Sequence, residues 1–155
     1  MFLWLGFLSP LICSILNSLV LPRNNKGLSH IVSVIGVGIA FCCSVLIFAS
    51  TLEDETTTRI YFGFNWIEVG ALNVPFELSI DRLSSVMMML ITGIGTLVHL
   101  YAGLYMRTEI RTNRFFSYLN LLVFMMLVIV LSSNMLLMFA GWQGVGLCSY
   151  LLTGY

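Results

Sequence analysis

Four long stretches of this sequence contain no Lys, Arg, Asp or Glu, and this pattern constrains the fold more than any other feature. They cover residues 1–22, 27–52, 83–106 and 115–155. A helix needs about 20 mostly apolar residues to span a bilayer. The first three stretches therefore fit one helix each, and the fourth fits two, with a break at Ser132-Ser133-Asn134. The sequence predicts an all-α, polytopic membrane bundle of about five transmembrane helices.

Composition supports a membrane protein and excludes several other classes. Of the 155 residues, 59% are hydrophobic and 9% are charged, whereas a soluble domain carries about 25% charged residues. The formal net charge is zero, so the charge balance indicates no nucleic-acid partner. The four cysteines lie inside apolar stretches without metal-ligand spacing, and we interpret them as packing residues. The first stretch lacks a basic start and a small-residue cleavage pattern, which favours a retained helix over a signal peptide.

The charged residues between the stretches predict an orientation. Arg23 and Lys26 follow the first predicted helix, whereas the connection between the second and third predicted helices is mainly acidic. Short loops rich in Lys and Arg stay on the cytoplasmic or matrix side. We therefore expect the acidic loop and the N-terminus to face outside. The connection after the third predicted helix is also basic, with Arg107, Arg111 and Arg114. The acidic residues of the outer loop are Glu53, Asp54, Glu55, Glu68 and Glu77.

Residues 51–80 are predicted to form an extramembrane outer loop with a structure of its own. Residues 60–69 are rich in aromatic and β-branched side chains, Gly70-Ala71 follows, and apolar residues alternate with other residues over 72–80. This pattern predicts a small β-hairpin on the outer membrane surface, against helix ends or another subunit, with its edge strand broken at Pro75. An irregular amphipathic loop is the alternative.

Two ionisable residues of the third predicted helix are candidates for a proton path. Asp81 stands where it can cap the helix N-terminus, or it can act as a proton-uptake group at the outer surface. His99 lies about two turns before the basic loop. It is either a hydrogen-bonded structural histidine or a proton relay near the inner face.

Gln143 is the third candidate, because membrane helices seldom place a polar side chain at mid-depth without a partner or a task. Ala140, Gly144 and Cys148 recur at every fourth position of the same predicted helix. They form a ridge of small residues that allows another helix to approach closely. The Gln143 amide on the neighbouring face either forms an interhelical contact or belongs to a transport path. These residues leave both interpretations open.

Several segments resemble a known family of membrane subunits. LSIDRLSSVMMML, HLYAGLYMR, RFFSYLNLL and above all NMLLMFAGWQGVGLCSYLLTGY are similar to the N-terminal part of the antiporter-like subunits of respiratory complex I. Within that family these segments look like subunit L of NADH–quinone oxidoreductase, called subunit 5 in mitochondria. The resemblance extends over residues 1–155, so we expect the chain to be an N-terminal transmembrane segment of such a subunit.

The resemblance implies a part in proton translocation in a bacterial or mitochondrial inner membrane. The implied partners are lipid, the other membrane subunits of the complex and the remainder of the same subunit. It also implies no redox chemistry and no cofactor in this chain, with NADH, quinone, flavin and iron–sulfur clusters bound elsewhere in the complex. The alternatives are a subunit of a multi-subunit cation/proton antiporter and a non-conducting scaffold.

Two departures from the family bear on the mechanism. The family's fifth-helix glutamate falls on Gln143, and an amide neither exchanges a proton near neutral pH nor holds a nearby lysine protonated. The lysine that pairs with this glutamate stands on a later helix of the family, beyond Tyr155. We therefore expect a fragment or one piece of a split subunit, with no complete proton path in this chain alone. We also expect the small-residue ridge to pack against one of those later helices.

Overall fold

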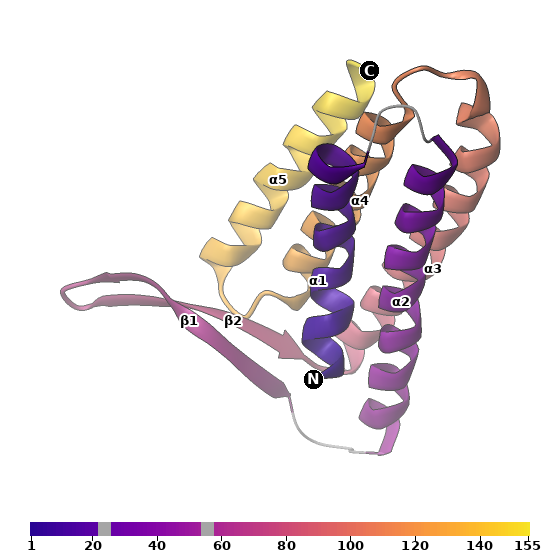
Figure 1. The fold of residues 1–155 in the computed structure, drawn as a ribbon. Helices are drawn as coiled ribbons and strands as arrows, with labels where there is room; N and C mark the ends of the chain where they lie inside the picture. Colours follow the sequence, from indigo (N-terminus) through magenta and orange to yellow (C-terminus); the bar gives the residue numbers. More distant parts are fainter. Residues whose placement is uncertain (22–25, 54–57) are drawn as a thin grey trace.

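The computed structural model describes residues 1–21, 26–53 and 58–155 of the chain, which form a helical bundle with one β-hairpin (Figure 1). Five helical segments of the described chain are long and apolar enough to cross a membrane, which confirms the predicted bundle. Arg23, Asp54 and Glu55 lie outside the described residues. The elements are α1 (Phe2–Ile15), the π-helical turn η1 (Leu16–Val20), α2 (Lys26–Glu53), β1 (Arg59–Val69), β2 (Leu72–Ile80), α3 (Arg82–Tyr105), the 3₁₀ turn η2 (Met106–Thr108), α4 (Thr112–Leu131) and α5 (Met135–Thr153).

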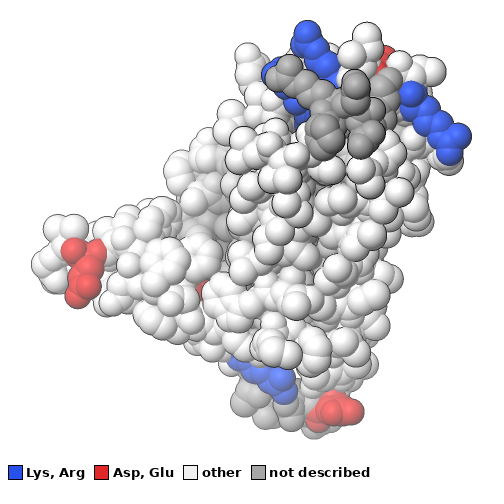
Figure 2. Space-filling model, in the orientation of Figure 1, with Lys and Arg blue, Asp and Glu red and all other residues white. Residues whose placement is uncertain are grey.

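The bundle has two chemically different ends. The hairpin end carries the N-terminus, β1, β2 and the turn at residues 132–134, and the arginine end carries Arg107, Arg111, Arg114 and the C-terminus (Figure 1). Figure 2 shows Lys, Arg, Asp and Glu at these ends and at the tip of the hairpin, with a broad uncharged belt between them. Large apolar side chains such as Ile94 and Leu97 are exposed on that belt, as expected for a surface that meets lipid or other apolar helices.

The predicted hairpin is confirmed, with one correction at Pro75. The antiparallel pairing runs from Arg59 with Ile80 to Val69 with Leu72. Gly70 has a φ of +60° at the first of the two turn positions, where two-residue hairpin loops favour glycine. The prediction that Pro75 breaks the strand is wrong, because β2 continues through it. Pro75 pairs with Asn65 between two register shifts, and such irregular places in a sheet tolerate a residue without an N–H.

The strand β2 is attached to the turn between α4 and α5. Leu78 forms an isolated antiparallel bridge with Ser132, and the Ser133 N–H donates to the Glu77 carbonyl at 3.3 Å. The Asn134 side-chain amide donates to the Pro75 carbonyl at 2.8 Å, and its Oδ1 accepts from the Leu137 N–H at 2.8 Å. Asn134 thus caps α5 and holds the hairpin with the same side chain.

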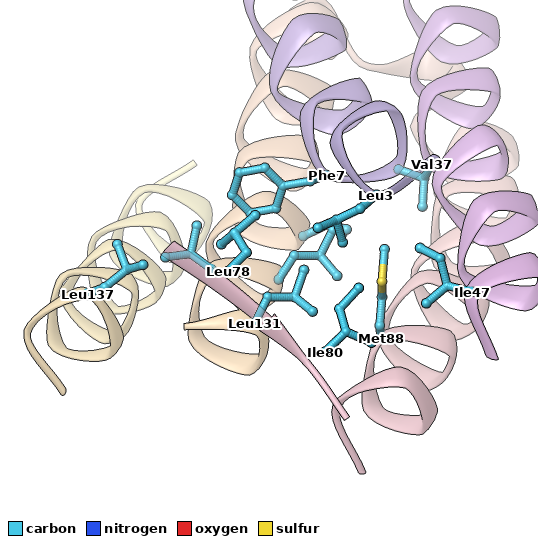
Figure 3. Close-up of a cluster of buried hydrophobic side chains, with 12 residues drawn as sticks. Leu3, Phe7, Val37, Ile47, Leu78, Ile80, Met88, Leu131 and Leu137 are labelled. Atoms are coloured by element: carbon cyan, nitrogen blue, oxygen red, sulfur yellow. The ribbon is translucent and has the colours of Figure 1, made fainter. Parts of the chain in front are cut away.

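The hairpin half of the bundle has an apolar core (Figure 3). The β2 residues Leu78 and Ile80 are 0% and 2% exposed and lie among residues of the helices. A strand that packs its apolar side chains into the bundle end removes them from water and stabilises the end of the bundle at the same time. The helical residues of this core include Leu3, Phe7, Val37, Ile47, Met88, Leu131 and Leu137.

Candidate functional site

Gln143 lies on the side of α5 that no other described helix covers. Its side chain is exposed and makes no hydrogen bond with the described residues. The neighbouring Trp142 and Tyr150 are 68% and 75% exposed. Gln143 stands about 12 Å along the axis from the first residue of α5, near the middle of a 19-residue helix. An amide at this depth loses the hydrogen bonds of water unless protein or internal water replaces them.

The small residues of α5 face α4. A Cβ placed on Gly144 would collide with the Met125 side chain, and Cys148 is buried at 1% exposure. Ala140 is half-buried beside them. Within the described chain, Met125 of α4 lies against Gly144, and a later helix as a further partner of this ridge stays a prediction. The close approach leaves the opposite side of α5, with Gln143, free for further contacts.

Asp81 caps α3 at the hairpin end. Its Oδ1 accepts from the Ser84 N–H at 2.6 Å, and the Asp81 N–H donates to the Ser84 hydroxyl at 2.8 Å, which is a reciprocal capping box. The backbone N–H and the hydroxyl of Ser84 hold the pKa of Asp81 below its ordinary value. The ionised carboxylate therefore stabilises the helix, and this contribution is lost as the pH falls through the lowered pKa.

His99 is fully buried in the arginine half of the bundle, at 0% exposure. Its Nδ1 lies 2.7 Å from the Gly95 carbonyl. A carbonyl oxygen only accepts, so Nδ1 carries the hydrogen and Nε2 of the neutral ring is a bare acceptor. No described group lies within ordinary hydrogen-bond limits of this Nε2, although the Asn120 side chain is close enough to interact with the ring. A buried polar atom without a partner costs about 1–3 kcal/mol, so the environment of this nitrogen needs an explanation.

The structure does not bring the three candidates together. Asp81 stands at the hairpin end, His99 lies inside the bundle towards the arginine end, and Gln143 is at mid-depth on the outer side of α5. Sequence reasoning missed His30 of α2, whose ring packs against Gly103 of α3 and has a buried Nε2 without a described partner. A histidine within a charge-free stretch was the available signal for it.

Comparisons with known proteins place the chain in a family. The family model described as "NADH-Ubiquinone oxidoreductase (complex I), chain 5 N-terminus" matches residues 66–116. The chain is 41% identical over 97% of its length to NADH-quinone oxidoreductase subunit L of Escherichia coli (strain K12), of which it covers 25%. It is 40% identical over 97% of its length to the protein of the same name from Pseudomonas aeruginosa, again covering 25%.

Two solved structures share the fold. One is a chain of the membrane-bound sulfane sulfur reductase, an archaeal respiratory membrane complex, with a TM-score of 0.75 and 17% identity over 97% of this chain and 22% of that chain. The other belongs to the Mrp complex from Dietzia sp. DQ12-45-1b, with a TM-score of 0.71 and 21% identity over 96% of this chain and 15% of that chain. These likenesses show the fold alone.

The chain spans about a quarter of the length of the curated relatives described above. The match covers nearly all of its 155 residues, including the segment around Gln143. By this similarity, the chain belongs to the NADH-quinone oxidoreductase subunit L family and corresponds to the N-terminal part of that subunit.

Proposed function

We propose that this chain is part of the proton-translocating membrane arm of an NADH–quinone oxidoreductase, in which electron transfer from NADH to quinone drives proton pumping. The observation that carries the proposal is 41% identity over 97% of the chain to a subunit with that name. In this proposal the flavin, iron–sulfur clusters, NADH and quinone are bound by other subunits of the complex.

The exposed side of α5 is the proposed contact with the remainder of the subunit. Phe139, Trp142 and Tyr150 are 60%, 68% and 75% exposed there, and Gln143 lies among them without a described hydrogen-bond partner. Helices that correspond to the rest of the relatives, in the same or a separate polypeptide, would cover this apolar face and provide a partner for the amide. Their arrival would place Gln143 in the interior of the assembled subunit, where the family has its glutamate.

His99 and Asp81 have different places in this proposal. His99 is buried with a bare Nε2, which suits a group that accepts and returns a proton. Asp81 is exposed at the hairpin end with its carboxylate engaged as a cap. Its proposed role is proton exchange at the outer surface, and Asn is the substitution that separates the two functions, because it caps equally well without titrating.

Two other functions have an observation in their favour. The fold shared with a chain of the Mrp complex favours a subunit of a cation/proton antiporter, and the non-titrating amide at Gln143 favours a non-conducting scaffold. Purification of the native membrane complex through an affinity tag on this chain separates the three. We expect a complex that oxidises NADH and acidifies one side of reconstituted vesicles when quinone is supplied.

The other outcomes identify the alternatives. A purified complex without NADH oxidation, but with cation-driven proton exchange, would show an antiporter and end the proposal. NADH oxidation with unchanged proton pumping after removal of this chain from an otherwise assembled complex would show a scaffold.

We propose the bacterial inner membrane or the mitochondrial inner membrane as the location, with the hairpin end and the N-terminus outside. Among the described residues, the arginine end has three Arg, one Lys and one Glu, whereas the hairpin end has two Arg and four acidic residues, a distribution that the positive-inside rule favours for this orientation. We expect a cysteine at the exposed position Ala71 to react with a membrane-impermeant maleimide from outside, and one at Thr108 only from inside. The native Cys42 can be replaced by Ala to lower the background. Labelling of the Ala71 position from the inner side alone would invert this topology.

A further inference from the structure

Buried polar atoms without a described partner are concentrated in one half of the bundle. In the described chain they are Asn17 Oδ1, Ser29 Oγ, His30 Nε2, His99 Nε2 and Asn120 Oδ1. All five belong to helix segments in the arginine half: η1, the first two turns of α2, the last third of α3 and the first half of α4. Native proteins pair nearly all of their buried polar groups with protein or with ordered water. Five in one half of the bundle therefore indicate that water is enclosed there.

The hairpin half shows the opposite behaviour. Its buried hydroxyls form pairs between α2 and α3, with Ser44 and Thr92 at 3.0 Å and Thr51 and Ser85 at 3.2 Å. Around them lies the apolar core of Figure 3. Both halves contain fully buried polar side chains. The halves differ in whether those side chains have hydrogen-bond partners in the described chain.

The two histidines of the chain meet in the arginine half. The His30 ring lies against Gly103, which follows His99 by one turn on the same face of α3. Both rings contact Phe116 of α4, with centroids 5.4 Å away for His30 and 6.3 Å away for His99. Asn120, one turn further along α4, donates to the Phe116 carbonyl at 2.9 Å. Its Oδ1 has no partner within ordinary hydrogen-bond limits, but the Asn120 side chain interacts with the His99 ring.

A polar cavity lies in the same half of the bundle, between η1 and the first turns of α4. Its volume is ≈ 430 Å³, and its lining includes Asn17, Ser18, Asn113, Arg114 and Ser117. The Asn17 amide donates to the Ser33 hydroxyl at 2.6 Å, and Ser33 donates to the Ser29 carbonyl at 2.8 Å. The lining therefore joins the exposed Arg114 to the buried groups of α2 and α4. A polar cavity of this size can hold several waters, each of which needs two to four polar partners.

We propose that the arginine half of the bundle encloses a hydrated site centred on His30 and His99, and that Nε2 of His99 takes up a proton there from enclosed water. In this step an O–H bond of a hydronium ion breaks, an N–H bond forms at Nε2, and the ring becomes an imidazolium that still donates from Nδ1 to Gly95. Return of the proton to water reverses the step. The proton uptake deepens the role given to His99 in the proposed function and rests on it, whereas the hydration rests on the described bundle alone and is tested separately.

The surroundings limit the pair to one extra proton. Two imidazolium rings near each other in an apolar interior repel strongly, and within the described bundle no carboxylate of α1, α2, α3 or α4 faces them to compensate. Glu109 belongs to the connection between α3 and α4, and Cys13 lies against Gly36. Other titratable side chains of this half include the outward-facing Tyr101 and Tyr105, Arg114 and Tyr118 at the cavity, and Arg107, Arg111, Tyr150 and Tyr155 nearer the arginine end.

Hydroxyl-radical footprinting of the wild-type chain in its native membrane tests the hydration. Phe116 and Phe7 are a matched pair, at 0% and 1% exposure, the first beside the two histidines and the second in the apolar core. We expect Phe116 to be hydroxylated severalfold faster than Phe7, because bound water is the local source of radicals. We expect Asn120→Leu to slow the labelling of Phe116, whereas the control Thr92→Val, which removes a paired hydroxyl, leaves it unchanged. Equally slow labelling of Phe116 and Phe7 in the wild-type chain would overturn the proposal.

The proton is tested by nitrogen NMR of the chain labelled at histidine. The sequence has two histidines, so the spectrum contains only the proposed pair. At alkaline pH we expect a protonated Nδ1 and a bare Nε2 for His99, and on acidification one proton per chain should enter the pair, with His99 Nε2 protonated. A His99 ring that stays neutral until the protein unfolds, or two rings that both become charged in one step, would contradict the site even if the complex pumps normally.

Discussion

Replacement of Gln143 by Glu is expected to raise quinone-coupled proton pumping severalfold, measured in vesicles and normalised to the amount of assembled complex. The substitution introduces a titratable group where the family has one, on the exposed mid-depth face of α5. A carboxylate at the centre of a membrane costs about 2.5–3.5 kcal/mol unless it is paired. A lysine supplied by the remainder of the subunit would offset this cost and lower the pKa of the new carboxylate.

Gln143→Met is the matched control for this substitution, because it keeps the length of the side chain and removes both the hydrogen bonds and any charge. We expect Gln143→Met to pump no better than the unsubstituted chain and to assemble less well, since Gln143 then no longer satisfies its partner in the interface. Equal pumping by the Glu, Gln and Met forms would show that position 143 has a structural role only.

The second large effect is expected at the contact between α4 and α5. A Cβ placed on Gly141 would lie 2.9 Å from Cγ1 and 3.1 Å from the backbone nitrogen of Ile129, and a backbone atom cannot move aside as a flexible side chain does. Gly141→Val should therefore separate the two helices and lower the free energy of unfolding by about 1–3 kcal/mol. The measurement is reversible unfolding of the chain in detergent micelles.

Gly146→Val provides the control for this prediction on the same helix. No atom lies within 4 Å of a Cβ built on Gly146, and both substitutions change the intrinsic helix propensity by the same amount. We expect Gly146→Val to leave the free energy of unfolding unchanged or slightly raised. Equal destabilisation by the two substitutions would mean that the helix, and not its contact with α4, is sensitive to the change.

Long-range contacts account for most of what sequence reasoning missed in the fold. The transmembrane segments and the hairpin limits followed from charge-free stretches and from residue alternation, which are local signals. Continuation of β2 through Pro75 depends instead on the register shifts opposite it in β1 and on the Asn134 side chain that binds its carbonyl. The π-helical turn Leu16–Val20 likewise has no local signature in its apolar sequence.

The candidate site shows the same division. The spacing on a helical wheel predicts the ridge of Ala140, Gly144 and Cys148. It does not predict the partner of the ridge, because a wheel carries no information about which helix packs against it. His99 was recognisable as a polar residue in an apolar stretch, whereas its relation to His30 depends on a glycine in α3 that admits the His30 ring. Such pairs join residues far apart in sequence, and periodicity carries no information about them.

The attachment of β2 to the turn between α4 and α5 also imposes an order on biosynthesis. Leu78 becomes buried against the helices and bonded to Ser132 only in the presence of residues that are translated more than fifty positions later. Until α4 has been inserted, β2 is already on the outer side of the membrane, but its apolar side chains are not yet covered by the helices. The outer loop is therefore translocated early and matured late, and the insertion of α4 and α5 completes it.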